Sequence, residues 1–196
     1  MIKAIDNLIQ EFSKLPAVGK KSAKRMVLHL LEQSSDNSLA LANAITTLKE
    51  SVVHCSSCHG YSENEICPIC LSQKRDKTII CIVEKPMDIF TFENIGGYNG
   101  VYHVLGGVIS PINGVTPSEL NFLSLESRIN ENSINEVIIG LGGSSEAETT
   151  VLYLSRILSK YGIKVTRLAR GLPAGSDLEF VDQLTLDQAF KERCSV

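Results

Sequence analysis

The chain of 196 residues has no tryptophan, no low-complexity tract and no repeat period. It also lacks any run of the roughly 20 apolar residues that a membrane-spanning helix needs. Charged and polar residues interrupt the apolar runs near the amino terminus, so no secretory signal is recognisable. We therefore expect a cytoplasmic protein whose thiols are reduced. With 43% hydrophobic and 21% charged residues, the composition is that of a globular protein with one compact domain plus small attachments, or two small domains.

The chain also has no excess of positive charge, since its formal net charge is −3. This average argues against a nucleic-acid partner, but the basic residues are segregated. Five of them and no acid lie between positions 14 and 25, and five more and no acid lie between positions 149 and 176. Acids gather elsewhere, for example at Glu119, Glu126, Glu131 and Glu136. Segregated basic segments can bind phosphate locally; the alternative interpretation is that they are solvated helix faces.

Cysteine is scarce, with six in the chain, yet four of them form one block of spacing C-x2-C-x8-C-x2-C: Cys55, Cys58, Cys67 and Cys70. Two C-x2-C turns present four thiolates to one ion, which is the arrangement that zinc prefers. Protein atoms then occupy every position of the tetrahedron, so we predict one structural Zn²⁺ ion per chain with no catalytic role.

Other interpretations of the cysteine block are weaker. Disulfides need an oxidising compartment, and a redox C-x-x-C needs no second pair. His54 and His59 flank the first pair. Either could replace a cysteine ligand, donate a hydrogen bond to a sulfur, or stand aside, and with four thiolates present we favour the last two roles.

The apolar pattern before the cysteines is helical. It predicts helices over residues 2–14, 20–32 and 37–50. After Cys70 the pattern changes to a continuous apolar run at 78–83, typical of a strand buried on both faces, in which Cys81 is a small core residue. Further strands are predicted at 101–105, 136–141 and 163–168.

Helices are predicted to alternate with these strands. One starts near Pro86, and two start at capping boxes formed by Thr116 with Glu119 and by Ser145 with Glu148. Alternation of this kind indicates an α/β domain with a parallel sheet over residues 78–172. The last segment, 173–196, is predicted to hold a strand at 180–184 and a helix at 187–193, and to serve in docking or oligomerisation.

Residues 15–19 separate the first two helices, and four basic residues follow at the start of the second: Lys20, Lys21, Lys24 and Arg25. A helix N-terminus binds phosphate through free backbone N–H groups and the helix dipole. Lys21 and Arg25 lie four residues apart and so share one face. A Walker motif is excluded because position 14 is lysine where that motif needs glycine. The segment resembles the helix-hairpin-helix element, which grips the DNA backbone without reading sequence.

Glu84 follows the predicted strand 78–83, at the end where sites of α/β domains lie. Glycines and serines at 140–145 follow a later strand, but Ser145 stands where the dinucleotide fingerprint needs its last glycine. A strand-end glutamate, a further strand and then Glu146-x-Glu148 resemble a Toprim domain. Active Toprim domains hold Mg²⁺ with that glutamate and an Asp-x-Asp motif. Gly142 and Ser144 stand at the two Asp positions, so Glu84, with Asp88 nearby, is an acidic remnant and the domain is predicted to be catalytically empty.

The whole order resembles the RecR family of bacterial recombination mediators in DNA repair. The resemblance includes the L-G-G-x-I-S-P segment at 105–111 and the R-x-A-R-G-x-P-x-G segment at 167–175. It implies a helix-hairpin-helix region at 1–53, a four-cysteine zinc finger at 54–71, a Toprim domain at 78–172 and an oligomerisation segment at 173–196. The family has Asn-Pro-Thr where this chain has Gly142, Gly143 and Ser144, whereas Glu146 and Glu148 are retained.

The resemblance further implies that the protein is not an enzyme. It implies sequence-independent DNA binding through Lys21 and Arg25, with Lys20 and Lys24 secondary, and joint action with RecO and RecF to load a recombinase on gapped DNA. It also implies self-assembly into a ring-like tetramer, or a dimer. Two alternatives stay open: a Mg²⁺-dependent Toprim nuclease or primase-like enzyme, and an adaptor that binds only proteins.

Overall fold

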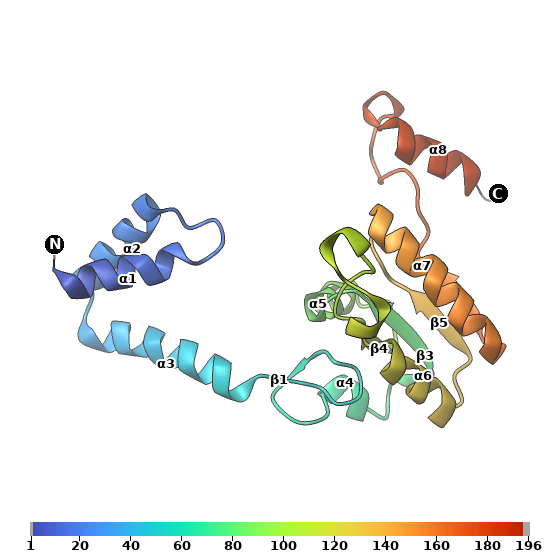
Figure 1. The fold of residues 1–196 in the computed structure, drawn as a ribbon, viewed down its shortest axis with the longest axis horizontal. Coiled ribbons are helices and arrows are strands. Elements are labelled where there is room, and N and C mark those ends of the chain that lie inside the picture. Colours follow the sequence, from blue (N-terminus) through green and yellow to red (C-terminus); the bar gives the residue numbers. More distant parts are fainter. Residues whose placement is uncertain (1, 194–196) are drawn as a thin grey trace. The chain divides into compact units, whose positions relative to one another are not determined.

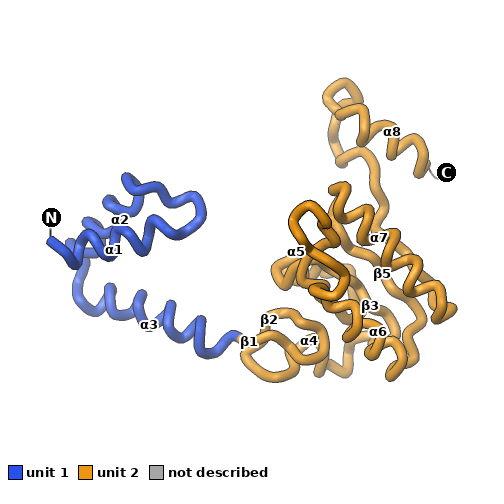
Figure 2. The backbone as a smooth tube through the Cα atoms, viewed as in Figure 1, with its two compact units in different colours: residues 1–52 blue, residues 53–196 orange. Residues whose placement is uncertain are grey.

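The computed structural model describes residues 2–193. The chain divides into two compact units, 1–52 and 53–196 (Figure 2). The first unit consists of three helices, α1 (Lys3–Ser13), α2 (Lys20–Glu32) and α3 (Ser35–Ser51) (Figure 1). The three helices predicted from apolar spacing are therefore confirmed, with α3 starting two residues earlier than expected. Ser34 causes this early start, because its side chain accepts a hydrogen bond from the backbone N–H of Asn37 (3.4 Å).

The first unit has a thin core. Among its described residues only Ala23 and Val27, both on α2, are buried. Leucines and isoleucines on all three helices remain exposed, among them Leu8, Leu31 and Ile45. This unit therefore keeps much of its apolar surface uncovered within one chain.

The second unit is built on a four-stranded parallel sheet in the order β4-β3-β5-β6. Its strands are β3 (Asp76–Val83), β4 (Gly100–Val104), β5 (Glu136–Ile139) and β6 (Lys164–Arg167). The central strand β3 pairs with both β4 and β5, so that Ile80 lies opposite Val101 on one side and Val137 on the other. The predicted α/β class and parallel sheet are confirmed.

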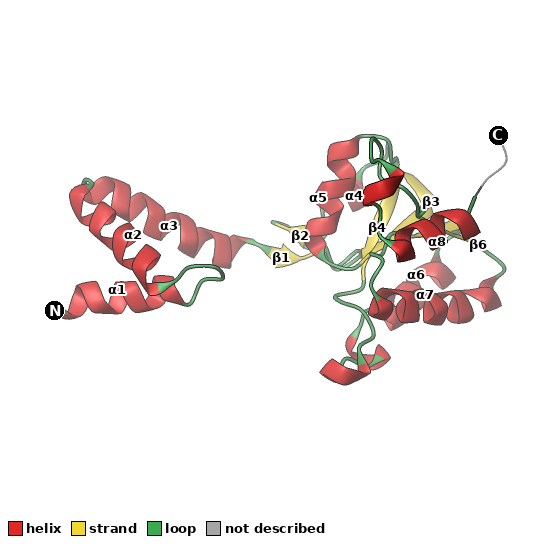
Figure 3. Ribbon diagram, turned by 90° about the horizontal axis from the view of Figure 1, so that it is seen from above, coloured by secondary structure: helices red, strands yellow, loops and turns green. Residues whose placement is uncertain are grey.

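Helices cover both faces of this sheet (Figure 3). Ile80 and Ile82 of β3 pack with Leu125 and Leu154, which lie on α6 (Phe122–Glu131) and α7 (Ser145–Leu158). The alternate residues of β3 point the other way and pack against α5 (Pro86–Ile95). Cys81 belongs to that second cluster and is 2% exposed, as predicted, and burial raises its pKa to about 12.

The prediction that a helix starts at Thr116 is wrong, because α6 starts six residues later. The capping box forms, with the Thr116 backbone N–H donating to Glu119 (2.8 Å), but it caps only a 3-10 turn (Pro117–Glu119). The chain is then extended at Leu120, and Asn121 donates to the carbonyls of Leu105 (3.0 Å) and Val104 (2.9 Å) at the end of β4. These bonds to the strand interrupt the helix, so α6 begins only at Phe122.

Two more local predictions are wrong. Ser144, and not Ser145, caps α7, because its hydroxyl accepts from the Ala147 N–H (3.1 Å). No strand forms at 180–184; Asp182 instead accepts from the Thr185 N–H (2.9 Å) and starts helix α8 (Gln183–Lys191). Positions 194–196 of the predicted oligomerisation segment lie outside the described residues. No helix of the described chain combines the length and the apolar character needed to cross a membrane.

Candidate metal centre and nucleic-acid interface

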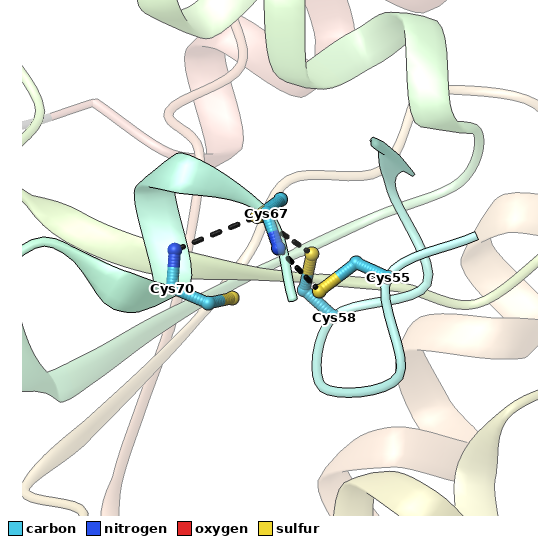
Figure 4. A group of neighbouring side chains, drawn as sticks. All are labelled: Cys55, Cys58, Cys67 and Cys70. Atoms are coloured by element: carbon cyan, nitrogen blue, oxygen red, sulfur yellow. Dashed lines mark hydrogen bonds between the residues drawn. The ribbon is translucent and has the colours of Figure 1, made fainter. Parts of the chain in front are cut away.

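The four predicted cysteines converge at one point of the second unit (Figure 4). Cys55 and Cys58 lie in the turn between β1 (Val53–His54) and β2 (Tyr61–Ser62), and Cys67 and Cys70 lie at the start of and within α4 (Pro68–Leu71). The four sulfur atoms all lie within 4.8 Å of one another. Three of these side chains are buried and Cys70 is partly buried, so the cluster is largely shielded from water.

Backbone N–H groups point at three of the sulfurs. Gly60 donates to Cys58 Sγ (3.4 Å), Cys67 to Cys55 Sγ (3.2 Å) and Cys70 to Cys67 Sγ (3.5 Å). Such donors favour the thiolate form that metals bind. The side chains of Cys58 and Cys70 also face Cys67, and their hydrogen bonds, that with Cys58 first, lower the pKa of Cys67.

The donor set and spacing fit zinc. A tetrahedral ion with Zn–S bonds of about 2.3 Å holds its sulfurs about 3.8 Å apart. The sulfurs of Cys58 and Cys67 are 3.7 Å apart. Four thiolates fill the tetrahedron and leave no open position for water or substrate. The cysteines therefore form a structural zinc site, and the predicted ion is confirmed as a structural cofactor.

The two flanking histidines do not bind the sulfurs. His54 Nδ1 lies 3.0 Å from the backbone carbonyl oxygen of His59, and His59 Nε2 lies 2.8 Å from the Ser124 hydroxyl on α6. His59 has a positive φ of 60°, which is uncommon for a residue other than glycine. Burial lowers the pKa of His59. His59 therefore attaches the first cysteine turn to α6, a role that spacing in the sequence does not reveal.

The predicted DNA-binding residues lie at the start of α2. Lys20, Lys21, Lys24 and Arg25 are all exposed. The first turn of α2 contains no acidic residue, and Gly19 at its N-cap offers no side chain to the free backbone N–H groups. None of the four basic side chains is in an ion pair with another described residue. The helix thus presents free donors and unneutralised positive charge on one surface.

The break between α1 and α2 is a tight turn. The Val18 N–H donates to the Leu15 carbonyl (3.1 Å), and Ala17 has a positive φ of 62°. A non-glycine residue in the left-handed region marks a strained position. The exposed basic side chains at the start of α2 follow directly after this turn.

The first unit also contains an apolar cavity of about 520 Å³ that the sequence pattern does not reveal. All three helices line it, with Ile5, Leu8, Phe12, Leu31, Leu41 and Ile45 among the lining residues. These are the apolar faces whose periodicity predicts the helices. Whether these faces cover one another or stay uncovered depends on how the three helices pack.

The predicted acidic remnant is spread along one end of the sheet. Glu84 follows β3 and forms an ion pair with Lys85 (3.2 Å), while Asp88 accepts from the Lys85 backbone N–H (2.8 Å). Glu146 and Glu148 lie in the first turn of α7. Within residues 2–193 only the four cysteines form a group of three or more potential metal ligands. The acids are therefore not gathered into a cation site.

Glu148 takes part in an ion-pair network that the sequence did not predict. Arg167 lies 3.5 Å from Glu148, and Arg170 forms a shorter pair with the same carboxylate. Both arginines also hold Glu192 at the end of α8, with Arg170 at 3.3 Å. The basic stretch at 149–176 is the one signal of this network in the sequence. The acidic partners lie 19 to 25 residues away from the arginines, so their pairing depends on tertiary structure.

Comparison with known proteins shows that the helical unit, the cysteine cluster and the parallel sheet occur together in one family. Models of four families match successive parts of the chain: the RecR helix-hairpin-helix at residues 5–49, the RecR four-cysteine zinc finger domain at 52–72, the Toprim domain at 78–169 and the RecR C-terminal region at 171–194. The chain is 46% identical to recombination protein RecR of Chloroherpeton thalassium, over 97% of this chain and 96% of that protein. The chain belongs to the RecR family.

Other relatives agree. Recombination protein RecR of Cytophaga hutchinsonii is 44% identical, over 97% of this chain and 94% of that protein. The counterpart in Treponema denticola is 44% identical, over 98% of each chain. The family resemblance predicted from the motifs is therefore confirmed, and the protein is a RecR-family recombination protein with helix-hairpin-helix, four-cysteine zinc-finger and Toprim elements.

Proposed function

We propose that this protein is a sequence-independent DNA-binding mediator that works without catalysis. The observation that carries the proposal is the N-terminus of α2. There four exposed basic side chains, Lys20, Lys21, Lys24 and Arg25, have no acidic partner among the described residues, and the free N–H groups of the helix lie beside them. Contacts to phosphate supply affinity that is independent of base sequence. Lys21 and Arg25, one helical turn apart, are the principal contacts.

Membership of the RecR family supports the choice of partners. We propose that the protein acts in the cytoplasm with RecO and RecF, and that together they load a recombinase on single-stranded gaps. The Toprim unit serves as a binding platform in this proposal. The carboxylate of Glu84 forms an ion pair with Lys85. Gly142 and Ser144 stand where a Mg²⁺ site needs carboxylates.

Self-assembly into a ring-like tetramer, or a dimer, is the second part of the proposal. Two uncovered apolar surfaces support it. One is the cavity among the helices of the first unit, and the other lies in the C-terminal segment, where Phe180 is 82% exposed and Leu184 is 83% exposed. Large apolar patches of this kind mark protein interfaces. Symmetry would multiply the few basic residues of each chain around bound DNA.

The same proposal assigns roles along the chain. Residues 1–53 bind DNA, residues 54–71 form the zinc finger, residues 78–172 form the Toprim platform and residues 173–196 serve in oligomerisation. The relative order of these segments follows the family models, which match 5–49, 52–72, 78–169 and 171–194.

Salt titration of DNA binding by the double variant Lys21→Ala, Arg25→Ala tests the proposal. We expect the variant to fold normally and to lose DNA binding at physiological salt. Removal of one cation that binds phosphate flattens the log–log slope by roughly 0.7–0.9, so residual low-salt binding should show a slope reduced by roughly 1.4–1.8. The matched control, Lys3→Ala with Lys49→Ala, removes two exposed lysines from α1 and α3. An unchanged slope in the first variant would refute the assignment of Lys21 and Arg25.

A further inference from the structure

The first cysteine turn, residues 55–60, is fastened to the edge of the Toprim sheet. Strand β4 is an edge strand of that sheet. Its last residue, Val104, donates its backbone N–H to the carbonyl of Cys58 (2.8 Å). An edge strand exposes unpaired backbone groups unless another segment covers them. The cysteine turn supplies that cover at the end of β4, so the metal site and the sheet edge are one structural piece.

Arg128 on α6 reaches this junction from the other side. Its Nη1 atom donates to the carbonyl of Tyr102 in β4 (2.5 Å) and lies 3.5 Å from the carbonyl of Ser57 in the cysteine turn. The guanidinium thus bridges the strand and the turn through two backbone oxygens. Arg128 forms no ion pair with any acid among the described residues. Glu131 lines the same cleft but does not pair with Arg128.

The charge of the zinc site is opposite in sign to that of Arg128. Four thiolates and one Zn²⁺ ion carry a net charge of about −2. Arg128 and Cys70 line the same polar cleft, of about 520 Å³, together with Ser56 and Ser57 of the turn. A cation beside a buried anionic cluster offsets part of its charge, because interactions in a poorly solvated site are weakly screened.

His103 cannot supply that charge. Its ring is buried in β4, and burial lowers its pKa to about 3, with the nearby charge of Arg128 adding to the shift. His103 is therefore neutral at physiological pH. Lys77 lines the cleft as well, but its side chain is exposed and makes no hydrogen bond or ion pair with a described residue. Arg128 is the cation that is held in place at this junction.

A second tie holds the turn to the same helix. The hydroxyl of Ser124 lies 2.8 Å from His59 Nε2 and donates to the carbonyl of Asn121 (3.1 Å). Ser124 and Arg128 lie one helical turn apart on α6. Helix α6 therefore contacts the turn on both sides of Cys58, through Ser57 and through His59.

We propose that Arg128 is a positioning residue of the zinc site, which couples metal binding in the finger to the stability of the Toprim sheet edge. It fixes the first cysteine turn on β4 and offsets the charge of the zinc–thiolate cluster. The proposal rests on the structural zinc site and not on DNA binding by α2. It makes the finger a part of the Toprim unit and predicts that zinc is held less firmly when Arg128 is replaced.

Zinc release and thermal unfolding of the full-length protein test this role. Outer groups that orient metal ligands typically contribute 10–100-fold to metal affinity. We therefore expect Arg128→Gln to release zinc to a colorimetric chelator about ten-fold faster than the parent protein. We also expect the difference in Tm between zinc-loaded and metal-stripped protein to become smaller, because the metal no longer stabilises the sheet edge through Arg128.

Three further variants make the test specific. Lys77→Gln removes an exposed cation from the same cleft and should release zinc at the parental rate. Arg128→Lys retains the charge without the planar fork, so its release rate should lie between those of the parent and of Arg128→Gln. If Arg128→Gln does not fold, the rates of Arg128→Lys and Ser124→Ala decide the matter, since both should exceed that of Lys77→Gln. The proposal would be overturned if Arg128→Gln released zinc at the parental rate. It would also be overturned if Arg128→Gln lowered the Tm of zinc-loaded and metal-stripped protein equally.

Discussion

Arg75 and Glu93 form a two-pronged ion pair that holds the start of strand β4 in place. Arg75 Nη1 lies 2.9 Å from one carboxylate oxygen of Glu93, and Nη2 contacts the other. The same guanidinium donates to the carbonyls of Tyr98 (3.2 Å) and Gly100 (3.4 Å), and Glu93 accepts from the Tyr102 hydroxyl (2.6 Å). One arginine thus connects α5, the loop after it and the edge strand β4, which is hydrogen-bonded to the first cysteine turn.

This ion pair predicts acid sensitivity. The Arg75 guanidinium, followed by the Tyr102 hydroxyl, holds the pKa of Glu93 below its ordinary value of 4.5, although burial opposes the shift. A carboxyl whose pKa is lower in the folded state contributes stability above its ordinary pKa and loses it as the pH falls through the lowered value. We expect Glu93→Gln to reduce the free energy of unfolding by about 2 kcal/mol at pH 7. The difference from the parent should shrink in urea titrations below pH 4.5. Glu131→Gln, at the exposed end of α6, is the control, and equal effects of the two variants would contradict the pair.

Zinc should be present at about one ion per chain. We expect Cys67→Ser to lose the metal and to lower the free energy of unfolding by more than about 4 kcal/mol, because loss of a metal ligand is among the largest single-residue effects. Metal analysis and thermal unfolding measure both. Cys81→Ser is the matched control, since Cys81 is equally buried but lies in the sheet. It should destabilise the sheet while zinc stays bound; a parent protein without zinc would refute the site.

Catalysis by the Toprim unit should be absent. We expect no cleavage or synthesis of DNA in the presence of Mg²⁺ or Mn²⁺, because Gly142 and Ser144 provide no carboxylate and Glu84 is paired with Lys85. Gel assays on labelled gapped and single-stranded DNA check this. A Mg²⁺-dependent activity that Glu84→Gln abolishes would instead establish the enzymatic alternative.

Replacing exposed apolar residues of the C-terminal segment should reduce the assembly state. Leu184 and Phe190 on α8 are 83% and 70% exposed. We expect Leu184→Ser with Phe190→Ser to lower the mass found by light scattering, with and without DNA, because an apolar interface would be deprived of its central side chains. Leu152→Ser, at an equally exposed position on α7 (71%), should leave the mass unchanged. If the double variant keeps the parental mass, the C-terminal segment does not form the oligomer interface.

Local patterns predicted most of the elements correctly. Apolar residues at helical spacing placed α1 and α2, and the continuous run before Glu84 placed β3 with Cys81 inside it. The errors arose where one local signal competed with a tertiary contact. The cap at Thr116 was real, but Asn121 bonds to the end of β4 and breaks the helix. The apolar residues near Phe180 suggested a strand, whereas the cap at Asp182 started a helix.

The sequence by itself determined the metal, the family and the candidate DNA-binding helix. Ligand type, short ligand spacing and basic residues within one helical turn are local properties, and they stay together in any fold of the chain. Only the tertiary structure decided that Glu93 meets Arg75, that Glu148 and Glu192 share two arginines, and that Arg128 joins the cysteine turn to the sheet edge. Each of these pairs joins residues far apart in the chain, so its geometry depends on how helices and strands pack and not on the identity of neighbouring residues.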